Sequence, residues 1–266
     1  MIRLRYLFAF ALILWLVMPM IPLGLWSVAK GWFFPDILPR DFSLRAWEYT
    51  LSETGGALAA LWTTTAIALA TTLLALVIGL PAGRALGLYR FRGKTAVELL
   101  ILAPIIVPGL TVVMGLHGVF LTLGLANSAT GVVLAHLIPA LPYMILVLAG
   151  IFANHDTQFE DQARSLGADR WQVFWHVTVP VIVPGIVGAS MFTFVVSWSQ
   201  YILTLVIGGG RVVTLPLQLF SVAAAGRNDL TGAIGVIYVL PGLLVIAISA
   251  RYLTSDKARL AGFGRI

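Results

Sequence analysis

The chain has 266 residues and carries 17 basic and 11 acidic side chains, which gives a formal net charge of +6 at pH 7. Hydrophobic residues make up 59% of the sequence and charged residues only 11%, with a mean hydropathy of +0.96. These values exclude an ordinary soluble globular domain and indicate a polytopic membrane protein. The sequence contains no cysteine, which excludes disulfide bonds, thiol chemistry and cysteine metal ligands.

Six stretches are long and apolar enough to cross the hydrocarbon core of a bilayer as helices. They cover residues 6–28, 57–80, 95–121, 131–153, 181–207 and 230–252. We therefore predict an all-α protein with six transmembrane helices, whose termini lie on the same side of the membrane. Its organisation would be a first span with the loop that follows it (1–56), a five-helix core (57–252) and a C-terminal tail (253–266).

The basic residues of the predicted loops fall unevenly on the two sides of the membrane. Of the 17 lysines and arginines, all but five lie on the side of the termini. The five exceptions are Lys30, Arg40, Arg45, Arg211 and Arg227. The positive-inside rule therefore places both termini in the cytoplasm, and residues 29–55 outside as an interfacial loop. Because the positive charge follows the topology instead of forming one stripe, no nucleic-acid partner is expected.

The N-terminus also resembles a secretory signal, because Arg3 and Arg5 precede a hydrophobic run and Ser27-Val28-Ala29 resembles a cleavage site. The run is about 22 residues long, whereas the core of a signal peptide usually has about 7 to 15 residues. We therefore favour an uncleaved membrane anchor.

Residues 154–180 form a polar interruption between two long hydrophobic stretches, and we call them the polar element. Residues 156–166 suit a short helix that Gly167 can end in a left-handed turn. Asp169 can then cap a second helix, with Gln172 completing a capping box. The apolar face of this second helix would carry Trp171, Phe174 and Trp175. The sequence thus predicts a helix-turn-helix at the membrane surface, ready to contact something outside the bilayer.

A nucleotide site has one weak candidate, the segment from Gly87 to Lys94. It has five residues between Gly87 and Gly93, where a phosphate-binding loop needs four, and these include bulky side chains in place of small ones. We interpret the segment as a basic loop that leads into the third span, with Lys94 and Glu98 forming an i,i+4 pair.

The sequence shows no pattern for a catalytic, cofactor-binding or metal site. Its four histidines lack metal-ligand spacing, and no serine lies in a Gly-x-Ser-x-Gly elbow. His117 and His136 fall inside or near predicted spans, where an ionisable side chain is a functional candidate because its burial is costly. The alternative, which we favour, is that these histidines make interhelical hydrogen bonds.

Several predicted spans contain prolines and polar groups, which at membrane depth usually face protein or water. Pro104 and Pro108 followed by Gly109 in the third span, and Pro241-Gly242 in the sixth, indicate that several helices are kinked. The candidate residues of a solute path are His117, Tyr143, Ser197, Ser199, Gln200 and Tyr201. The alternative for each is ordinary helix packing, in which small and polar residues let helices approach each other.

One segment of the polar element resembles a known family pattern. It reads Asp161-Gln162-Ala163, three residues, Gly167, nine residues, and then Val177-Thr178-Val179-Pro180. This resembles the EAA loop of permease subunits in binding-protein-dependent ABC importers, whose pattern is Glu-Ala-Ala, three residues, Gly, nine residues, Ile-x-Leu-Pro. The spacing matches throughout, Asp161 stands for the family glutamate, and Gln162 replaces an alanine.

Other segments resemble the spermidine/putrescine-type permeases in the same order along the chain. They are residues 62–65 (Trp-Thr-Thr-Thr), 79–82 (Gly-Leu-Pro-Ala) and 136–143. The likeness covers nearly the whole chain. Near the fifth span, however, the family often has an acidic pair, whereas this chain has Ser197-Trp198-Ser199-Gln200-Tyr201, before Thr214-Leu215-Pro216. This difference argues against a cationic polyamine and favours a neutral or anionic solute, or one bound by other residues.

The resemblance implies the type I ABC importer permease fold in the bacterial cytoplasmic membrane. It also implies the partners: two cytoplasmic ATPase subunits that bind ATP and magnesium, a second permease that is usually a different chain, a solute-binding protein outside, and membrane lipid. This chain would itself be non-catalytic and bind no cofactor. The polar element would contain the coupling helix, which closure of the ATPase dimer moves as a rigid lever.

The residues that the resemblance assigns to ATPase coupling form one continuous run. They are Glu160, Asp161, Gln162, Ala163, Arg164, Ser165, Leu166, Gly167, Ala168 and Asp169. Glu160, Asp161 and Arg164 would lie on the ATPase-facing helix, and Gly167 would allow the corner after it.

Two other classes of protein compete with this interpretation. An ion-gradient-driven secondary transporter or channel would carry charges inside its spans, and the only acidic residue in a predicted span is Glu98, near a cytoplasmic end. A non-transport membrane scaffold would not need the kinked and polar third to fifth spans.

Overall fold

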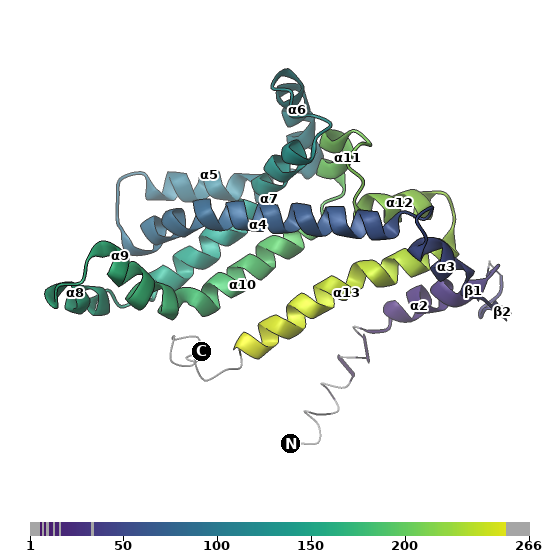
Figure 1. Ribbon diagram of the computed structural model, residues 1–266, viewed down its shortest axis with the longest axis horizontal. Coiled ribbons are helices and arrows are strands. Elements are labelled where there is room, and N and C mark those ends of the chain that lie inside the picture. The colour runs from purple at the N-terminus through teal and green to yellow at the C-terminus, as the bar shows by residue number, and fades with distance from the viewer. Residues whose placement is uncertain are drawn as a thin grey trace. The chain divides into compact units, whose positions relative to one another are not determined.

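The computed structural model describes residues 6, 8, 11, 12, 14, 15, 17–32 and 35–253. The chain divides into two compact units, one formed by Met1–Thr64 with Val213–Gly242 and the other by Thr65–Val212 with Leu243–Ile266. The described residues are mostly helical (Figure 1). Two long helices, α4 (Ala57–Leu88) and α13 (Asn228–Leu253), each run through both units.

The first unit combines short helices with one small sheet. Besides parts of α4 and α13, it contains α2 (Met20–Val28), β1 (Ala29–Lys30), β2 (Asp41–Phe42), α3 (Arg45–Leu51) and α12 (Leu215–Ala224). The two strands pair antiparallel. Ala46 of α3 packs with Leu230 and Ala233 of α13. A side chain at Gly232 would collide with the backbone of Ser27, so this glycine lets α13 lie against α2.

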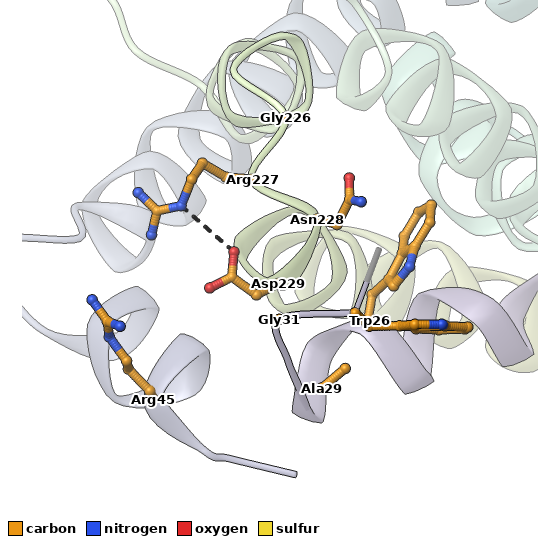
Figure 2. A pocket seen from close by; sticks show the side chains of 9 residues that line it. Trp26, Ala29, Gly31, Arg45, Gly226, Arg227, Asn228 and Asp229 are labelled. Atoms are coloured by element: carbon orange, nitrogen blue, oxygen red, sulfur yellow. Dashed lines mark ion pairs between the residues drawn. The ribbon is translucent and has the colours of Figure 1, made fainter. Parts of the chain in front are cut away.

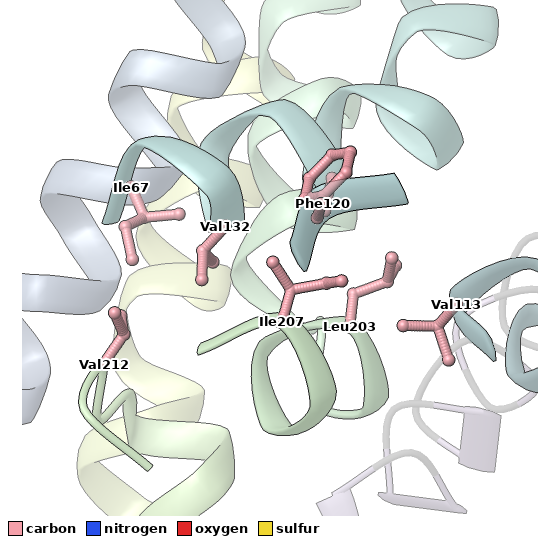
Figure 3. Packing of buried hydrophobic residues seen from close by; sticks show 8 residues of the cluster. Ile67, Val113, Phe120, Val132, Leu203, Ile207 and Val212 are labelled. Carbon is pink, nitrogen blue, oxygen red and sulfur yellow. The ribbon is translucent and has the colours of Figure 1, made fainter. Parts of the chain in front are cut away.

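The second unit is built around α7. Besides the rest of α4 and α13, it contains α5 (Lys94–Ile106), α6 (Gly109–Thr122), α7 (Ala129–Ala153), α8 (Gln158–Ser165), α9 (Arg170–Val173), a π-helical turn (Phe174–Thr178), α10 (Val179–Trp198) and α11 (Ile202–Gly208). Helix α7 packs against α5, α6, α10 and α11. One core cluster joins α4, α6, α7 and α11 through Ile67, Val113, Phe120, Val132, Leu203, Ile207 and the following Val212 (Figure 3).

A stripe of glycines brings α4 close to α7. Gly79, Gly83 and Gly87 are spaced four residues apart on α4, and a side chain at any of them would overlap α7. The residues that it would meet on α7 include Met144, Leu148 and Phe152 in turn. Without a hydrophobic driving force in lipid, close backbone approach of this kind is a main source of helix association.

Three helices among the described residues are long and apolar enough to cross a membrane: Ala57–Leu88, Ala129–Ala153 and the continuous helix Arg170–Trp198. Helices α5 and α6 make a fourth span if they are counted together. The second and fourth predicted spans therefore correspond to single helices, which are eight and two residues longer than expected. Helix α13 covers the sixth. Residues 7, 9, 10, 13 and 16 of the first span, and residues 254–266 of the tail, lie outside the described residues.

The third predicted span, residues 95–121, is not one straight helix. It breaks between Ile106 and Gly109, and the two halves meet at 100°. Pro108 has no N–H to continue the helix, and Val107 before it is extended, with ψ at 132°. The sequence indicated a kink here, and the structure has a sharp bend.

The fifth predicted span, residues 181–207, is also wrong at both ends. It begins earlier, because the helix runs without interruption from Arg170. It ends earlier, because α10 stops at Trp198 and α11 starts only at Ile202. The three residues 199–201 lie between them.

Candidate functional site

The polar element folds as a helix-turn-helix, as predicted. Its first helix, α8, is slightly shorter than the predicted 156–166, and Gly167 after it has a φ of +90°. The Gly167 N–H donates to the Arg164 carbonyl at 3.0 Å, and the Ala168 N–H donates to the Ala163 carbonyl at 3.1 Å. This pair of bonds is the Schellman arrangement, which satisfies the last carbonyls of a helix and needs a left-handed residue at the position of Gly167.

The predicted capping box begins the second helix. Asp169 Oδ1 accepts from the N–H groups of Trp171 and Gln172, both at 2.8 Å. The Asp169 N–H in turn donates to Gln172 Oε1 at 3.0 Å. These bonds fix the direction in which the chain leaves the Gly167 turn.

The second helix of the polar element is continuous with the fifth span. The sequence predicted a boundary between them at residues 180–181, and this boundary is wrong. Helix α9 passes through the π-helical turn into α10 without a break. Trp171 and Trp175 are exposed, and Phe174 is half-buried with its ring edge-on to Trp175. A change in the direction of α9 therefore also changes the direction of the helix Arg170–Trp198, which is long enough to span the membrane.

The coupling-helix residues divide into one that points inward and several that point outward. Asp161, Gln162, Ser165 and Leu166 are exposed and line a shallow depression with Gln158. Leu166 is 90% exposed and stands directly before the Gly167 turn. Ala163 and Ala168 are half-buried, and Arg164 and Asp169 are exposed.

Glu160 is the inward-pointing residue, although the sequence had grouped it with Asp161 on the ATPase-facing helix. Its side chain is 2% exposed. Its Oε2 accepts from Arg84 at 2.6 Å and from Arg164 at 3.2 Å. Its Oε1 accepts from the Thr178 hydroxyl at 2.8 Å and lies 3.3 Å from His155 Nε2. We call these five side chains the Glu160 cluster.

The charge of Glu160 is stabilised by its surroundings. Burial alone would raise the pKa of the Glu160 carboxyl, but the hydrogen bond from Thr178 and the positive charge of Arg84 outweigh this effect and hold the pKa below its ordinary value. Arg84 also stacks on the Phe152 ring, 5.8 Å from its centroid. The carboxylate is therefore ionised at neutral pH, within a cavity of about 1090 Å³ that Arg84, Arg164 and Arg170 help to line.

A second buried polar cluster lies at the other end of α10. His136 of α7 is 1% exposed. Its Nδ1 lies 2.9 Å from the Ser197 hydroxyl of α10, and its Nε2 lies 2.9 Å from the Thr204 hydroxyl of α11. The Thr204 hydroxyl donates to the Gln200 carbonyl at 3.0 Å, so the neutral tautomer protonated on Nε2 satisfies every group. The interhelical hydrogen bond favoured for His136 is confirmed.

The other candidates for a solute path are more scattered. Ser199, Gln200 and Tyr201 form the break between α10 and α11, with Ser199 exposed and the other two half-buried. Tyr143 lies half-buried on α7. His117 lies half-buried on α6, and its Nδ1 has no hydrogen-bond partner among the described residues.

The sequence analysis did not identify Arg84, His155, Thr178 and Thr204 as site residues, because only the fold brings them to Glu160 and His136.

The first unit holds a cavity of about 260 Å³ between α2, α3 and the start of α13 (Figure 2). Arg45 and Arg227 lie on one side of it, and Arg227 pairs with Asp229 at 3.6 Å. Trp26 and Trp32 form its aromatic wall, with ring centroids 6.3 Å apart. Within the described parts of both units, no three histidine or acidic side chains converge as a metal site would require.

Comparison with known proteins gives one family and several relatives. Residues 75–259 match the family described as "Binding-protein-dependent transport system inner membrane component". The chain is 26% identical to "Spermidine/putrescine transport system permease protein PotC" of Haemophilus influenzae, over 92% of this chain and 95% of that protein. It is 31% identical to "Molybdenum transport system permease protein ModB" of Mycobacterium bovis, over 69% and 75%.

A solved structure has a similar fold. It is a chain of the "bacterial ABC transporter involved in the import of the acidic polysaccharide alginate", with a TM-score of 0.68 and 20% identity. The match covers 94% of this chain and 95% of that chain.

Proposed function

We propose that the polar element is the surface that couples this chain to cytoplasmic ATPase subunits. The chain belongs to the family of binding-protein-dependent transport system inner membrane components. It is thus a multi-pass permease subunit of an ABC importer in the bacterial inner membrane. The coupling residues would be residues 160–169, in which the exposed side chains make the contact with the ATPase and the buried Glu160 does not. The chain itself would bind no nucleotide, and ATP and magnesium would be held by its partners.

The observation that carries this proposal is the exposed outer side of α8. Leu166 is 90% exposed at the corner made by Gly167. A large apolar side chain held out by a rigid turn, with polar neighbours around it, is typical of an anchor that fills a pocket on a partner protein. The Schellman turn and the capping box hold this corner in one shape before any partner arrives, which lowers the entropic cost of binding.

The remaining parts of the assembly are proposed from the family. We propose six spans with both termini in the cytoplasm and the type I importer fold. Two ATPase subunits, a second permease and an external solute-binding protein would complete the transporter. Family membership favours this function over an ion-gradient-driven transporter or channel.

The solute is proposed only as a class. The relatives are named for cationic polyamines and for molybdenum, so the family accepts unlike solutes. At the break between α10 and α11, this chain presents the uncharged residues Ser199, Gln200 and Tyr201. We propose that a path lined there by uncharged polar groups carries a small neutral or anionic solute in preference to a polyamine.

The proposal is tested by purifying the tagged chain from native membranes in mild detergent and identifying its stoichiometric partners by mass spectrometry. We expect an ATPase subunit with the wild type and a loss of about tenfold or more with Gly167→Val, since a β-branched residue is strained at positive φ. A side chain at Gly167 meets no atom within 4 Å, so the effect would come from the backbone alone.

Gly93→Val is the matched control. Gly93 has a φ of +86°, equally open space and a place in the loop before α5, outside the polar element. It should retain the ATPase subunit. A wild-type chain that purifies alone in several mild detergents would contradict the proposal, as would a wild-type amount of ATPase subunit bound to Gly167→Val at equal membrane levels.

A further inference from the structure

We propose that Glu160 is a positioning residue that fastens the coupling helix α8 to both α4 and the start of α10, so that α8 cannot move without them. This inference rests on the proposed function, because it takes α8 to be the part on which the ATPase acts. It assigns the outer residues of α8 to contact with the partner and the single inner residue to transmission of the movement.

Helix α8 depends on Glu160 for its position. It has eight residues, which is too short for a helix to be stable on its own. Glu160 is the only residue of α8 that is buried. The contacts that fix α8 against the rest of the second unit are therefore concentrated in one carboxylate, apart from the turn that joins α8 to α9.

The carboxylate has donors from three separate parts of the chain. Arg84 is on α4, 76 positions earlier, and Thr178 ends the π-helical turn, 18 positions later. Arg164 comes from α8 itself, and His155 from the segment before it. Each oxygen has two partners, which uses the acceptor capacity of an ionised carboxylate in full.

A buried charge makes this joint stiff. Moving α8 away from either long helix would take partners from an ionised carboxylate whose side chain is only 2% exposed. An unpaired buried charge is much more costly than a neutral unpaired group, so joint movement is favoured over separation. A hydrophobic contact of the same area would slide with less resistance, because it has no preferred direction.

The point where Glu160 holds the long helix is its irregular turn. Thr178 is the last residue of the π-helical turn, and its hydroxyl also lies 3.4 Å from the Val173 carbonyl. A π-turn carries one residue more than an α-turn and often marks a site where a helix changes register. Glu160 thus acts on the helix Arg170–Trp198 where its backbone is least regular.

The test uses the assembled transporter in lipid nanodiscs and needs no solute. Because this chain has no cysteine of its own, spin labels can be placed at Phe159→Cys on α8, which is exposed but does not line the depression, and at Val181→Cys on α10. The distance between them is measured with and without a magnesium complex of a non-hydrolysable ATP analogue. In the wild type we expect one narrow distribution that nucleotide leaves unchanged, because the two helices move together.

In Glu160→Gln, the ATPase subunit should remain bound at the wild-type ratio, because the outer side of α8 is intact. The label distribution should broaden and shift with nucleotide, with about tenfold more displaced conformers if the joint weakens by about 1.4 kcal/mol. Glu98→Gln is the matched control, since Glu98 forms a half-buried pair with Lys94 at 3.9 Å, outside the Glu160 cluster, and it should behave as wild type.

A Glu160→Gln complex with the narrow, nucleotide-independent distribution of the wild type would overturn the inference. If this variant does not insert into the membrane, Thr178→Val replaces it in the test. This substitution removes one hydroxyl and should broaden the distance distribution less than Glu160→Gln. An unchanged distribution in Thr178→Val would overturn the inference. Failure of the proposed function is distinct, since the wild-type chain would then bind no ATPase subunit at all.

Discussion

The two ends of α10 are each fixed by a buried polar cluster, and the clusters are built differently. At the start, the ionised Glu160 holds Thr178 with the help of two arginines. At the end, the neutral His136 holds Ser197 and, beyond the break, Thr204. The first cluster lies in the polar element, where charged side chains can be solvated in part. The second lies among apolar helices, where only neutral groups that satisfy each other can be buried cheaply.

The two clusters also differ in how many partners hold the central side chain. Glu160 has four partners, and no single loss would leave it alone. His136 has two, one on each ring nitrogen, so the loss of either leaves one nitrogen unsatisfied. The charged joint therefore resists movement in several directions, while the neutral one fixes a single arrangement of α7, α10 and α11.

The largest effect should come from Arg84→Met, which removes the closest charged partner of Glu160 and keeps a long apolar side chain near Phe152. We expect a loss of about 2 kcal/mol in the free energy of unfolding, below the usual cost of about 3–5 for breaking a buried pair, because the Arg84 side chain is 26% exposed. The measurement is unfolding by SDS in mixed micelles. Arg90→Met, at an exposed loop position, is the control, and equal losses for both variants would remove the charged cluster from the comparison.

A smaller effect is expected for His136→Phe. Hydrogen bonds between helices in a membrane contribute about 0.6 kcal/mol each on average, so two of them predict a loss of about 1 kcal/mol. The same unfolding assay measures it, with the exposed His176→Phe as control. A loss greater than that of Arg84→Met would reverse the comparison and make the neutral cluster the stronger of the two.

The smallest effect on the unfolding free energy is expected for a change of pH near neutrality. The folded-state pKa of Glu160 lies below its ordinary value of 4.5, so its contribution is fully present above that value and is lost as pH falls below it, toward the folded-state pKa. The difference in unfolding free energy between wild type and Glu160→Gln should stay constant from about pH 8 to about pH 6 and shrink below about pH 4.5. A difference that changes between pH 6 and 8 would mean that a group other than Glu160 controls the joint.

Local features of the polar element could be predicted from sequence because a few neighbouring residues determine them. The left-handed turn at Gly167 and the capping box of Asp169 and Gln172 are of this kind, and both are confirmed. So is the family, which the spacing around Gly167 indicated and the match over residues 75–259 shows.

Features that depend on distant residues could not be predicted. Glu160 and Asp161 are adjacent acids, and the first is buried among partners that include Arg84, 76 positions earlier, and Thr178, 18 positions later. The break at residues 199–201 was missed because the average hydropathy of 181–207 stays high across it, while Ser197 and Thr204 are drawn to His136 on another helix. The sharp bend before Pro108 was foreseen as a kink, since its cause is local.

The π-helical turn relates the residue spacing between Gly167 and Val177 to the rotation of α9 about its axis. Each residue in an α-helix advances the chain by about 100°, and the turn at Phe174–Thr178 accommodates one residue beyond the regular count. The turn can absorb the deletion of one residue by becoming a regular α-turn, whereas it has no room for a further residue, so an insertion between Gly167 and Thr178 would rotate α9 by about 100° against α10. The corner that carries Leu166 would then face elsewhere, although every side chain of the coupling helix was still present. The nine residues between Gly167 and Val177 thus set a rotational phase, and a one-residue insertion there should be more harmful than a one-residue deletion or most substitutions.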